Sequence, residues 1–248
     1  MPISLPFELE VLNTQINIHL LLEYIAFFVA FRYYLYLRRN TKDSINTSNR
    51  FSIVLGAAIG AFLGSRLIGY LENPVAINSL KEILSLMNIK TIMGGLFGGL
   101  LGVEITKKII GEKESSGDLF VLPIILGIFI GRIGCFLSGV NEFTYGKQTT
   151  SFLGMNLGDG IMRHPIALYE LVFLIVIFVF FYRARKKNEL ENGLLFKYFM
   201  LLYFGFRFFI EFLKPNTFFV LSLSSIQLLC IVCFIYYGST LKKVFYAN

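Results

Sequence analysis

The residues best suited to chemistry in this chain are arginines that stand inside long apolar stretches. Arg132 lies between Gly131 and Gly134, and Arg66 and Arg207 have similar apolar surroundings. A charge at the centre of a bilayer costs roughly 2.5–3.5 kcal/mol on the insertion scale, so it usually has a partner or a function. Because a guanidinium binds two phosphate oxygens at once, the pattern favours an anionic ligand. The alternatives are an arginine that snorkels to the headgroups, or separate structural ion pairs.

Other polar groups accompany the arginines. Glu211 follows Arg207 by four residues, so the two share one helix face, and His164 precedes an apolar stretch. We predict that these groups meet in the outer half of a membrane, as a site for an anionic lipid headgroup. The three cysteines show no metal-ligand spacing with a histidine, so we expect neither a metal nor another cofactor.

Composition excludes a soluble domain. The chain has 248 residues, of which 55% are hydrophobic, and its mean hydropathy is +0.66. The net charge of +7 could indicate nucleic acid binding, but the cations lie in short loops between apolar stretches. That distribution is typical of membrane topology, so we expect no nucleic acid partner.

Seven apolar stretches are long enough to cross a bilayer, which needs roughly 20 residues each. We therefore predict an all-α integral membrane protein with seven transmembrane helices, forming a single membrane domain over residues 1–248. Glycines recur every fourth residue in the second and third stretches, a spacing that lets helices pack closely. The seven stretches are Ile18–Leu37, Phe51–Leu71, Thr91–Ile110, Leu119–Leu137, Ile166–Tyr182, Gly193–Leu213 and Phe218–Gly238.

The loops differ in charge. One set, with the carboxyl-terminal tail, carries thirteen lysines and arginines, and the opposite set carries five. By the positive-inside rule, the amino terminus is outside and the carboxyl terminus inside. The glycine-rich outer segment Ser138–Pro165 is expected to form a small cap over the outer membrane face, with a disordered loop as the alternative.

Five segments, in order along the chain, resemble the prolipoprotein diacylglyceryl transferases of the bacterial inner membrane. Gly131–Gly139 is similar to that family's signature, Gly-Arg-x-Gly-Asn-Phe-x-Asn-Gly. His164–Glu170 resembles its His-Pro-x-Gln-Leu-Tyr-Glu, and Tyr203–Phe212 resembles its Tyr-Gly-x-x-Arg-x-x-x-Glu-Phe. Gly64–Tyr70 and Met93–Gly99 match two further family segments, and His19 falls near a family histidine.

The resemblance implies transfer of a diacylglyceryl group from phosphatidylglycerol to the lipobox cysteine of a prolipoprotein signal peptide. It implies a transferase of lipoprotein biogenesis in the bacterial inner membrane, in contact with membrane lipid, and we expect a monomer. Arg132 and Arg207 would stabilise the phosphate leaving group, and His164 and Glu142 are the candidate bases. The expected substrate-binding residues are Arg66, Gly94, Gly95, Gly131, Gly134, Gly139, Tyr169, Tyr203 and Glu211.

The chain also departs from the family pattern. Met93 replaces a histidine, Cys135 and Ser138 replace asparagines, Ala167 replaces a glutamine, and Leu21 aligns with a tyrosine. Two alternatives therefore stay open. The chain transfers a group from phosphatidylglycerol to a different acceptor, or it is a lipid-binding or transport protein of the membrane.

Overall fold

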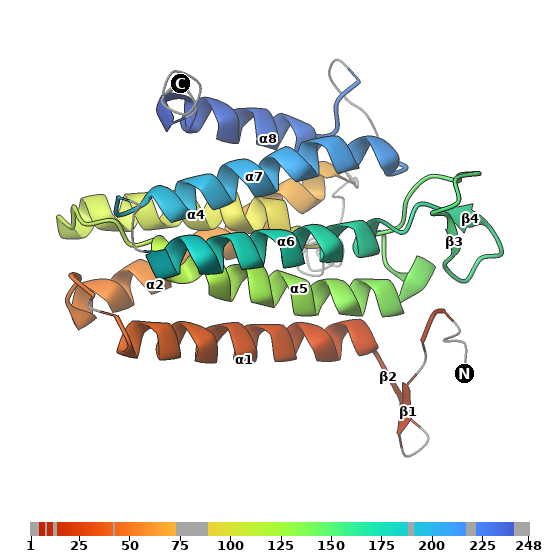
Figure 1. Ribbon diagram of the computed structural model, residues 1–248, viewed down its shortest axis with the longest axis horizontal. Coiled ribbons are helices and arrows are strands. Elements are labelled where there is room, and N and C mark those ends of the chain that lie inside the picture. The colour runs from red at the N-terminus through yellow and green to blue at the C-terminus, as the bar shows by residue number, and fades with distance from the viewer. Residues whose placement is uncertain are drawn as a thin grey trace, which may run out of the picture. The chain divides into compact units, whose positions relative to one another are not determined.

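The computed structural model is mostly helical (Figure 1). It describes residues 5–7, 9–11, 14–41, 43–72, 89–187, 191–216 and 222–240. The chain divides into two compact units, each built from three separate stretches. The first unit comprises Met1–Lys42, Gly117–Phe196 and Phe212–Pro215, and the second comprises Asp43–Ser116, Lys197–Glu211 and Asn216–Asn248. The single membrane domain stays a prediction.

Three long helices form the first unit. They are α1 (Ile18–Arg39), α5 (Val121–Leu137, preceded by the 3-10 turn η1 at Asp118–Phe120) and α6 (Ile166–Lys187). Helix α5 packs against both α1 and α6, as Figure 1 shows. Its side chains Leu122 and Ile125 are buried, as are Leu174 and Phe181 of α6. The core of this unit is therefore centred on α5, the helix that carries Arg132.

The ends of these helices are fixed by local signals. Asn17 caps α1, since its side-chain oxygen accepts a hydrogen bond of 3.0 Å from the backbone N–H of Leu20. Arg38 and Arg39 lie in the last turn of α1, where cations complement the helix dipole. Helix α6 begins directly after Pro165, whose fixed backbone angle suits the entry to a helix.

Short strands stand beside the helices. β1 (Leu9–Val11) pairs antiparallel with β2 (Thr14–Ile16), and β3 (Met155–Asn156) pairs antiparallel with β4 (Met162–Arg163). The segment Ser138–Pro165 also holds the 3-10 turn η2 (Gly139–Asn141). The prediction of an all-α fold therefore omitted two small hairpins. Strands of two or three residues have too few alternating positions to stand out in the sequence.

The turn between β3 and β4 is held by side chains. The Asn156 side-chain oxygen accepts hydrogen bonds from the N–H groups of Gly158 and Gly160 at 2.9 and 3.0 Å. The Arg163 Nε donates to the Asp159 carboxylate at 2.8 Å, and this bond lowers the pKa of Asp159. The ion pair therefore persists above the ordinary aspartate pKa and is lost as the pH falls through the lowered value.

The second unit contains α2 (Thr47–Glu72), α4 (Ile92–Ile110), most of α7 (Leu194–Ile210) and α8 (Ser225–Tyr236). The 3-10 turn η3 (Glu211–Leu213) follows α7. Glycines of α2 face glycines of α4, so that the two backbones are in close contact. Helix α8 packs against both α2 and α4. The glycine repeats thus form the helix–helix contact that their spacing predicts.

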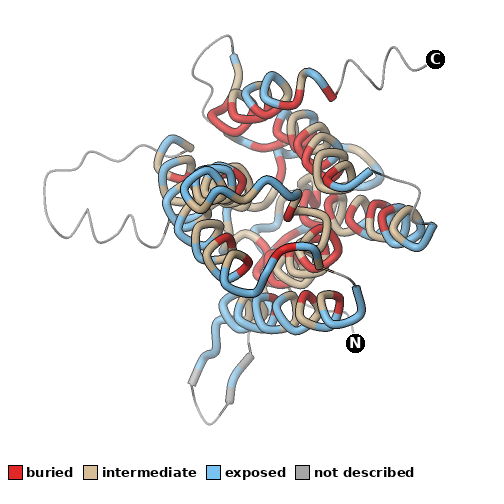
Figure 2. The backbone as a smooth tube through the Cα atoms, turned by 90° about the vertical axis from the view of Figure 1, so that its left-hand side faces the viewer, coloured by how far each residue is buried: buried red, intermediate tan, exposed pale blue. Residues whose placement is uncertain are grey.

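Among the described residues, four helical segments are long and apolar enough to cross a membrane, namely Ile18–Arg39, Thr47–Glu72, Asp118–Leu137 and Ile166–Lys187. Many large apolar side chains of these helices are exposed, and Figure 2 colours exposed positions pale blue. Phe27 is 70% exposed and Val172 is 64% exposed, a surface that suits lipid better than water. The protein is therefore a multi-pass helical membrane protein.

The count of seven crossings stays a prediction. Each of the seven predicted stretches contains a helix, but three of these helices are less clear candidates. Helix α4 holds Glu104, Lys107 and Lys108, α7 has 17 residues and α8 has 12. The first residues of the stretch predicted at Phe218–Gly238 lie outside the described part of the chain.

The contact between α2 and α4 leaves no room for a side chain at Gly60. A Cβ atom there would meet the backbone oxygen of Gly98 far inside van der Waals distance. We expect Gly60→Ala to destabilise the protein by about 1–3 kcal/mol, as overpacking does. Thermal unfolding in detergent measures the loss. The matched control is Gly205→Ala in α7, where a Cβ would meet nothing within 4 Å, and equal melting temperatures for the two variants would contradict this packing.

Candidate active site

Arg132 is buried on α5 and held by a carboxylate of α6. Its Nε lies 2.9 Å from Oε1 of Glu170, and the Glu170 side chain is fully buried. Because a guanidinium has five N–H donors, one carboxylate cannot use them all. The Nη1 group lies 3.7 Å from the sulfur of Cys135, one helical turn further along α5. Arg132 is therefore a paired, buried cation and does not snorkel to the surface.

Next to this pair lies a histidine from another helix. His19 stands in the first turn of α1, and its Nδ1 is 3.2 Å from Oε1 of Glu142. Its imidazole also shares a hydrogen bond with the thiol of Cys135. A Cβ on Gly134 would come within 3.2 Å of the His19 Cα, so glycine lets α1 and α5 approach closely here. The result is a connected set of polar side chains inside the first unit.

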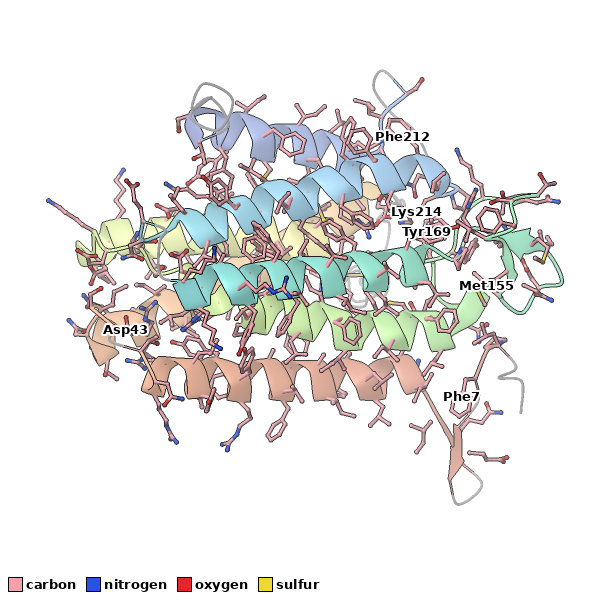
Figure 3. The ribbon with its side chains drawn as sticks, viewed as in Figure 1. Phe7, Asp43, Met155, Tyr169, Phe212 and Lys214 are labelled. Carbon is pink, nitrogen blue, oxygen red and sulfur yellow. The ribbon has the colours of Figure 1, made fainter. Side chains whose placement is uncertain are left out.

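His164 lies in the same unit but makes a separate contact. Its Nδ1 is 3.1 Å from the hydroxyl of Tyr169, one turn into α6. Its backbone carbonyl accepts a hydrogen bond from the N–H of Gly146, and its own N–H donates to the carbonyl of Lys147. Figure 3 labels Tyr169 near the start of α6, the end to which β4 leads. The backbone of His164 is therefore fixed to the segment that follows Glu142.

The signature glycines have different surroundings. Gly139 has a φ of +54°, in the left-handed region that favours glycine, and a Cβ there would clash with the carbonyl of Leu157. A Cβ on Gly131 would meet nothing within 4 Å, so no close approach explains this glycine. A small pocket beside Gly139 is lined also by Cys135, Tyr145 and Ala167.

Arg207 repeats the arrangement of Arg132 within the second unit. Its Nη2 donates a 3.0 Å hydrogen bond to Glu211, which is fully buried and stands four residues on, as the sequence spacing predicts. The amide of Asn216 donates to the other carboxylate oxygen at 2.7 Å. Tyr203 is buried one turn before Arg207 and stacks on Phe199 at 5.8 Å. Glu211 therefore has a partner for each of its two oxygens.

Arg66 on α2 is also partly buried. Its guanidinium lies 4.8 Å from the ring centroid of Phe62, a cation–π distance, and its buried Nε has no hydrogen-bond partner in the described part of the chain. Gly94 lies against Gly64 of α2, and its N–H donates to the capping side chain of Thr91. The contact of Gly94 with Gly64 brings the first turn of α4 against α2. Arg66 lies two residues after Gly64, near the carboxyl end of α2.

The predicted site residues divide between the two units. A single pocket that unites them stays a prediction. Within the described residues, no three histidine, cysteine, aspartate or glutamate side chains are grouped so that they could hold a metal ion. The first unit holds Gly131, Arg132, Gly134, Gly139, Glu142, His164 and Tyr169, and the second holds Arg66, Gly94, Gly95, Tyr203, Arg207 and Glu211.

Three polar residues of the first unit were absent from the predicted site, namely His19, Cys135 and Glu170. Glu170 has a sequence signal, because a carboxylate inside an apolar stretch needs a cation, and Arg132 stands in the neighbouring stretch. His19 is one of two histidines in the chain and lies near the outer end of a predicted crossing. Its contact with Glu142 joins residues 123 positions apart, which single-sequence spacing cannot reveal.

Comparison with known proteins identifies the family of the chain. The family model described as prolipoprotein diacylglyceryl transferase matches residues 6–241. The chain belongs to this family. A phosphatidylglycerol–prolipoprotein diacylglyceryl transferase of Nitratidesulfovibrio vulgaris (strain DP4) is 36% identical over 186 residues, covering 69% of this chain and 64% of the relative.

Two further relatives carry the same name. The one from Ehrlichia ruminantium (strain Welgevonden) is 34% identical over 65% of this chain and 62% of its own length. The one from Wolbachia sp. subsp. Brugia malayi (strain TRS) is 30% identical over 71% of this chain and 66% of its own length. The chain thus spans slightly less than two thirds of the length of the curated relatives that it matches.

The Arg132–Glu170 pair yields a stability prediction. Removing one partner leaves an uncompensated buried charge, so Glu170→Ala should cost about 3–5 kcal/mol of unfolding free energy. Replacing both residues, with Arg132→Leu and Glu170→Leu together, should recover most of that loss. Unfolding in detergent measures both variants, with the exposed Glu114→Gln as control. A double variant as unstable as Glu170→Ala would show that the pair does not act as a unit.

Proposed function

We propose that the protein transfers the diacylglyceryl group of phosphatidylglycerol to the cysteine thiol of a prolipoprotein signal peptide. Membership of the family supports the reaction class, because the relatives carry that activity in their names. The observation that carries the proposal is the pair of buried arginines, Arg132 and Arg207, each held by one buried carboxylate. Fixed cations in apolar surroundings suit a lipid phosphate, which brings its own negative charge into the membrane.

The transfer reaction requires a deprotonated thiol and stabilisation of the phosphate leaving group, and buried arginines can provide the second. The thiol loses its proton and its sulfur attacks the glycerol carbon that carries the phosphate. The carbon–oxygen bond breaks, a thioether forms, and glycerol phosphate leaves with the electron pair. Negative charge grows on the phosphate as the bond breaks, and preorganised guanidinium groups stabilise that charge best where water is excluded. Arg132 and Arg207 are assigned this role.

The remaining site residues bind or orient the lipid in this proposal. Glu170 and Glu211 hold the two arginines in place, so they act through the cations. The buried Nε of Arg66, which has no hydrogen-bond partner among the described residues, suits an anionic headgroup oxygen. Tyr203 and Tyr169 would shape the headgroup site, and Gly131, where a Cβ would meet nothing within 4 Å, would leave room for an acyl chain. No cofactor enters the reaction.

The departures from the family pattern bear on the acceptor. Cys135 and Ala167 both line the pocket beside Gly139, and they replace an asparagine of the family signature and a glutamine of the His-Pro segment. A pocket altered in this way favours, as the second candidate, transfer from phosphatidylglycerol to a different acceptor. The donor-binding arginines are the same in both candidates, so only the acceptor distinguishes them.

We place the protein in the bacterial inner membrane as a monomer with seven crossings. The thirteen-to-five distribution of cations supports an outer amino terminus and an inner carboxyl terminus. On this topology, the loop Ser138–Pro165 and the start of α1 are outside, where a prolipoprotein presents its lipobox cysteine.

Substituting the arginines tests the proposed function. Arg132→Ala and Arg207→Ala should each lower transfer of label from phosphatidylglycerol to a lipobox peptide by about 100–1,000-fold, since each removes a preorganised donor. Membrane insertion should persist, and Lys113→Ala in the exposed inner loop is the control. Near-normal turnover by either variant would make that arginine structural. Wild-type protein that binds phosphatidylglycerol but labels no lipobox peptide would favour the second candidate.

The topology has its own test. Single cysteines placed in each loop of a cysteine-free variant should react with an impermeant reagent in intact cells only when the loop is outside. We expect labelling within Ser138–Pro165 and none within Arg183–Asn192. Labelling of the latter loop in intact cells would overturn the orientation.

A further inference from the structure

Five side chains of the first unit form a continuous polar chain through the contact of α1, α5 and α6. Glu142 touches His19, His19 touches Cys135, Cys135 touches Arg132, and Arg132 touches Glu170. A carboxylate stands at each end of it, and the thiol lies at its centre. A row of polar side chains inside an apolar helix bundle is destabilising unless each of them has a hydrogen-bond partner or a function.

The order of these contacts resembles that of an activated nucleophile. A carboxylate orients an imidazole, and the imidazole shares a hydrogen bond with a thiol. The His19 side chain is 16% exposed, whereas the guanidinium side chain of Arg132 is 8% exposed, so the imidazole is the more accessible of the two. The thiol of Cys135 is thus held between a base and a cation, the same two groups that an incoming acceptor thiol needs.

We propose that His19 is the proton acceptor for the acceptor thiol, and that Glu142 is the positioning residue that orients its imidazole. The inference rests on the proposed function and names the base that the sequence left open between His164 and Glu142. Glu142 contacts the imidazole directly, with its Oε1 at 3.2 Å from Nδ1, and the His19 side chain is partly exposed. His164, in contrast, has a tyrosine hydroxyl at its Nδ1 in place of a carboxylate.

In the proposed step, one proton moves from the acceptor thiol to His19 and then to the leaving group or to water. The acceptor thiol gives its proton to the His19 imidazole, and Glu142 stabilises the imidazolium that forms. The sulfur then attacks the glycerol carbon, and the carbon–oxygen bond to phosphate breaks beside Arg132. The imidazolium returns the proton to the departing phosphate or to water. No oxidant, metal or further reactant is required.

Chemical rescue tests the base. His19→Ala should lower transfer to a lipobox peptide by about 100-fold or more, the usual contribution of a general base. Added imidazole should restore part of the rate in proportion to its concentration, because the small molecule can occupy the vacated space. The comparison is His164→Ala with the same imidazole series. Rescue of His164→Ala but not of His19→Ala would assign the base to His164 and overturn the inference.

Two conservative substitutions of Glu142 test its positioning role. Glu142→Gln removes the charge and keeps the size, whereas Glu142→Asp keeps the charge. We expect Glu142→Gln to lower kcat with KM nearly unchanged, Glu142→Asp to retain more activity, and the exposed Glu114→Gln to behave as wild type. Equal activity of the two Glu142 variants would show that its charge has no role.

A second measurement does not depend on turnover. Cys135 should react with methyl methanethiosulfonate faster than Cys230 and Cys233, since a thiol beside a base more readily forms the reactive thiolate. His19→Gln should slow the modification of Cys135 alone, as followed by mass spectrometry on the intact, folded protein. If wild-type protein labels no peptide, the proposed function fails, whereas His19-dependent reactivity of Cys135 would still show that the imidazole takes a proton from a neighbouring thiol. Reactivity of Cys135 that is unchanged in His19→Gln would contradict it.

Discussion

The structure depends on one constraint, which is that charged side chains inside apolar helices must be paired. Arg132 with Glu170 and Arg207 with Glu211 satisfy it in the two units, and all four side chains are buried. Burying each ion pair costs desolvation free energy that a pair of apolar residues would not incur. Stability alone therefore does not explain why the ion pairs are present. A fixed cation in apolar surroundings is instead what binding of a lipid phosphate requires. The pairs therefore connect the fold to the proposed chemistry.

Packing brings these pairs into position. Helix α5 is covered by α1 and α6, and the glycine at position 134 lets the first turn of α1 approach the turn of α5 that carries Cys135. Glycines of α2 and α4 bring those helices into backbone contact in the second unit. Close packing reduces the freedom of the side chains between helices, so the arginines keep one geometry. Preorganisation of this kind is the main source of catalysis by charge stabilisation.

The sequence predicted the helices and the pairs within one helix better than the contacts between helices. The i, i+4 spacing of Arg207 and Glu211 is a local pattern, and the structure has that pair. Long apolar stretches likewise predicted where helices lie, with ends that differ by a few residues because capping residues such as Asn17 decide them. The contact of His19 with Glu142 depends on how α1 meets the cap segment, and periodicity carries no information about it. The short hairpins of the first unit went unpredicted because strands of two or three residues show too little alternation in the sequence.

Selective retention of lipid tests the central claim most directly, because it needs no acceptor. Native mass spectrometry of the detergent-solubilised protein, exchanged with equal amounts of phosphatidylglycerol and phosphatidylcholine, measures which lipid stays bound. Buried arginines that bind an anionic headgroup predict preferential retention of phosphatidylglycerol by the wild type. That preference should be lost in Arg132→Gln and in Arg207→Gln, both of which keep a polar side chain. Equal retention of the two lipids by the wild type, or an unchanged preference in both variants, would contradict the assignment of these arginines to the lipid phosphate.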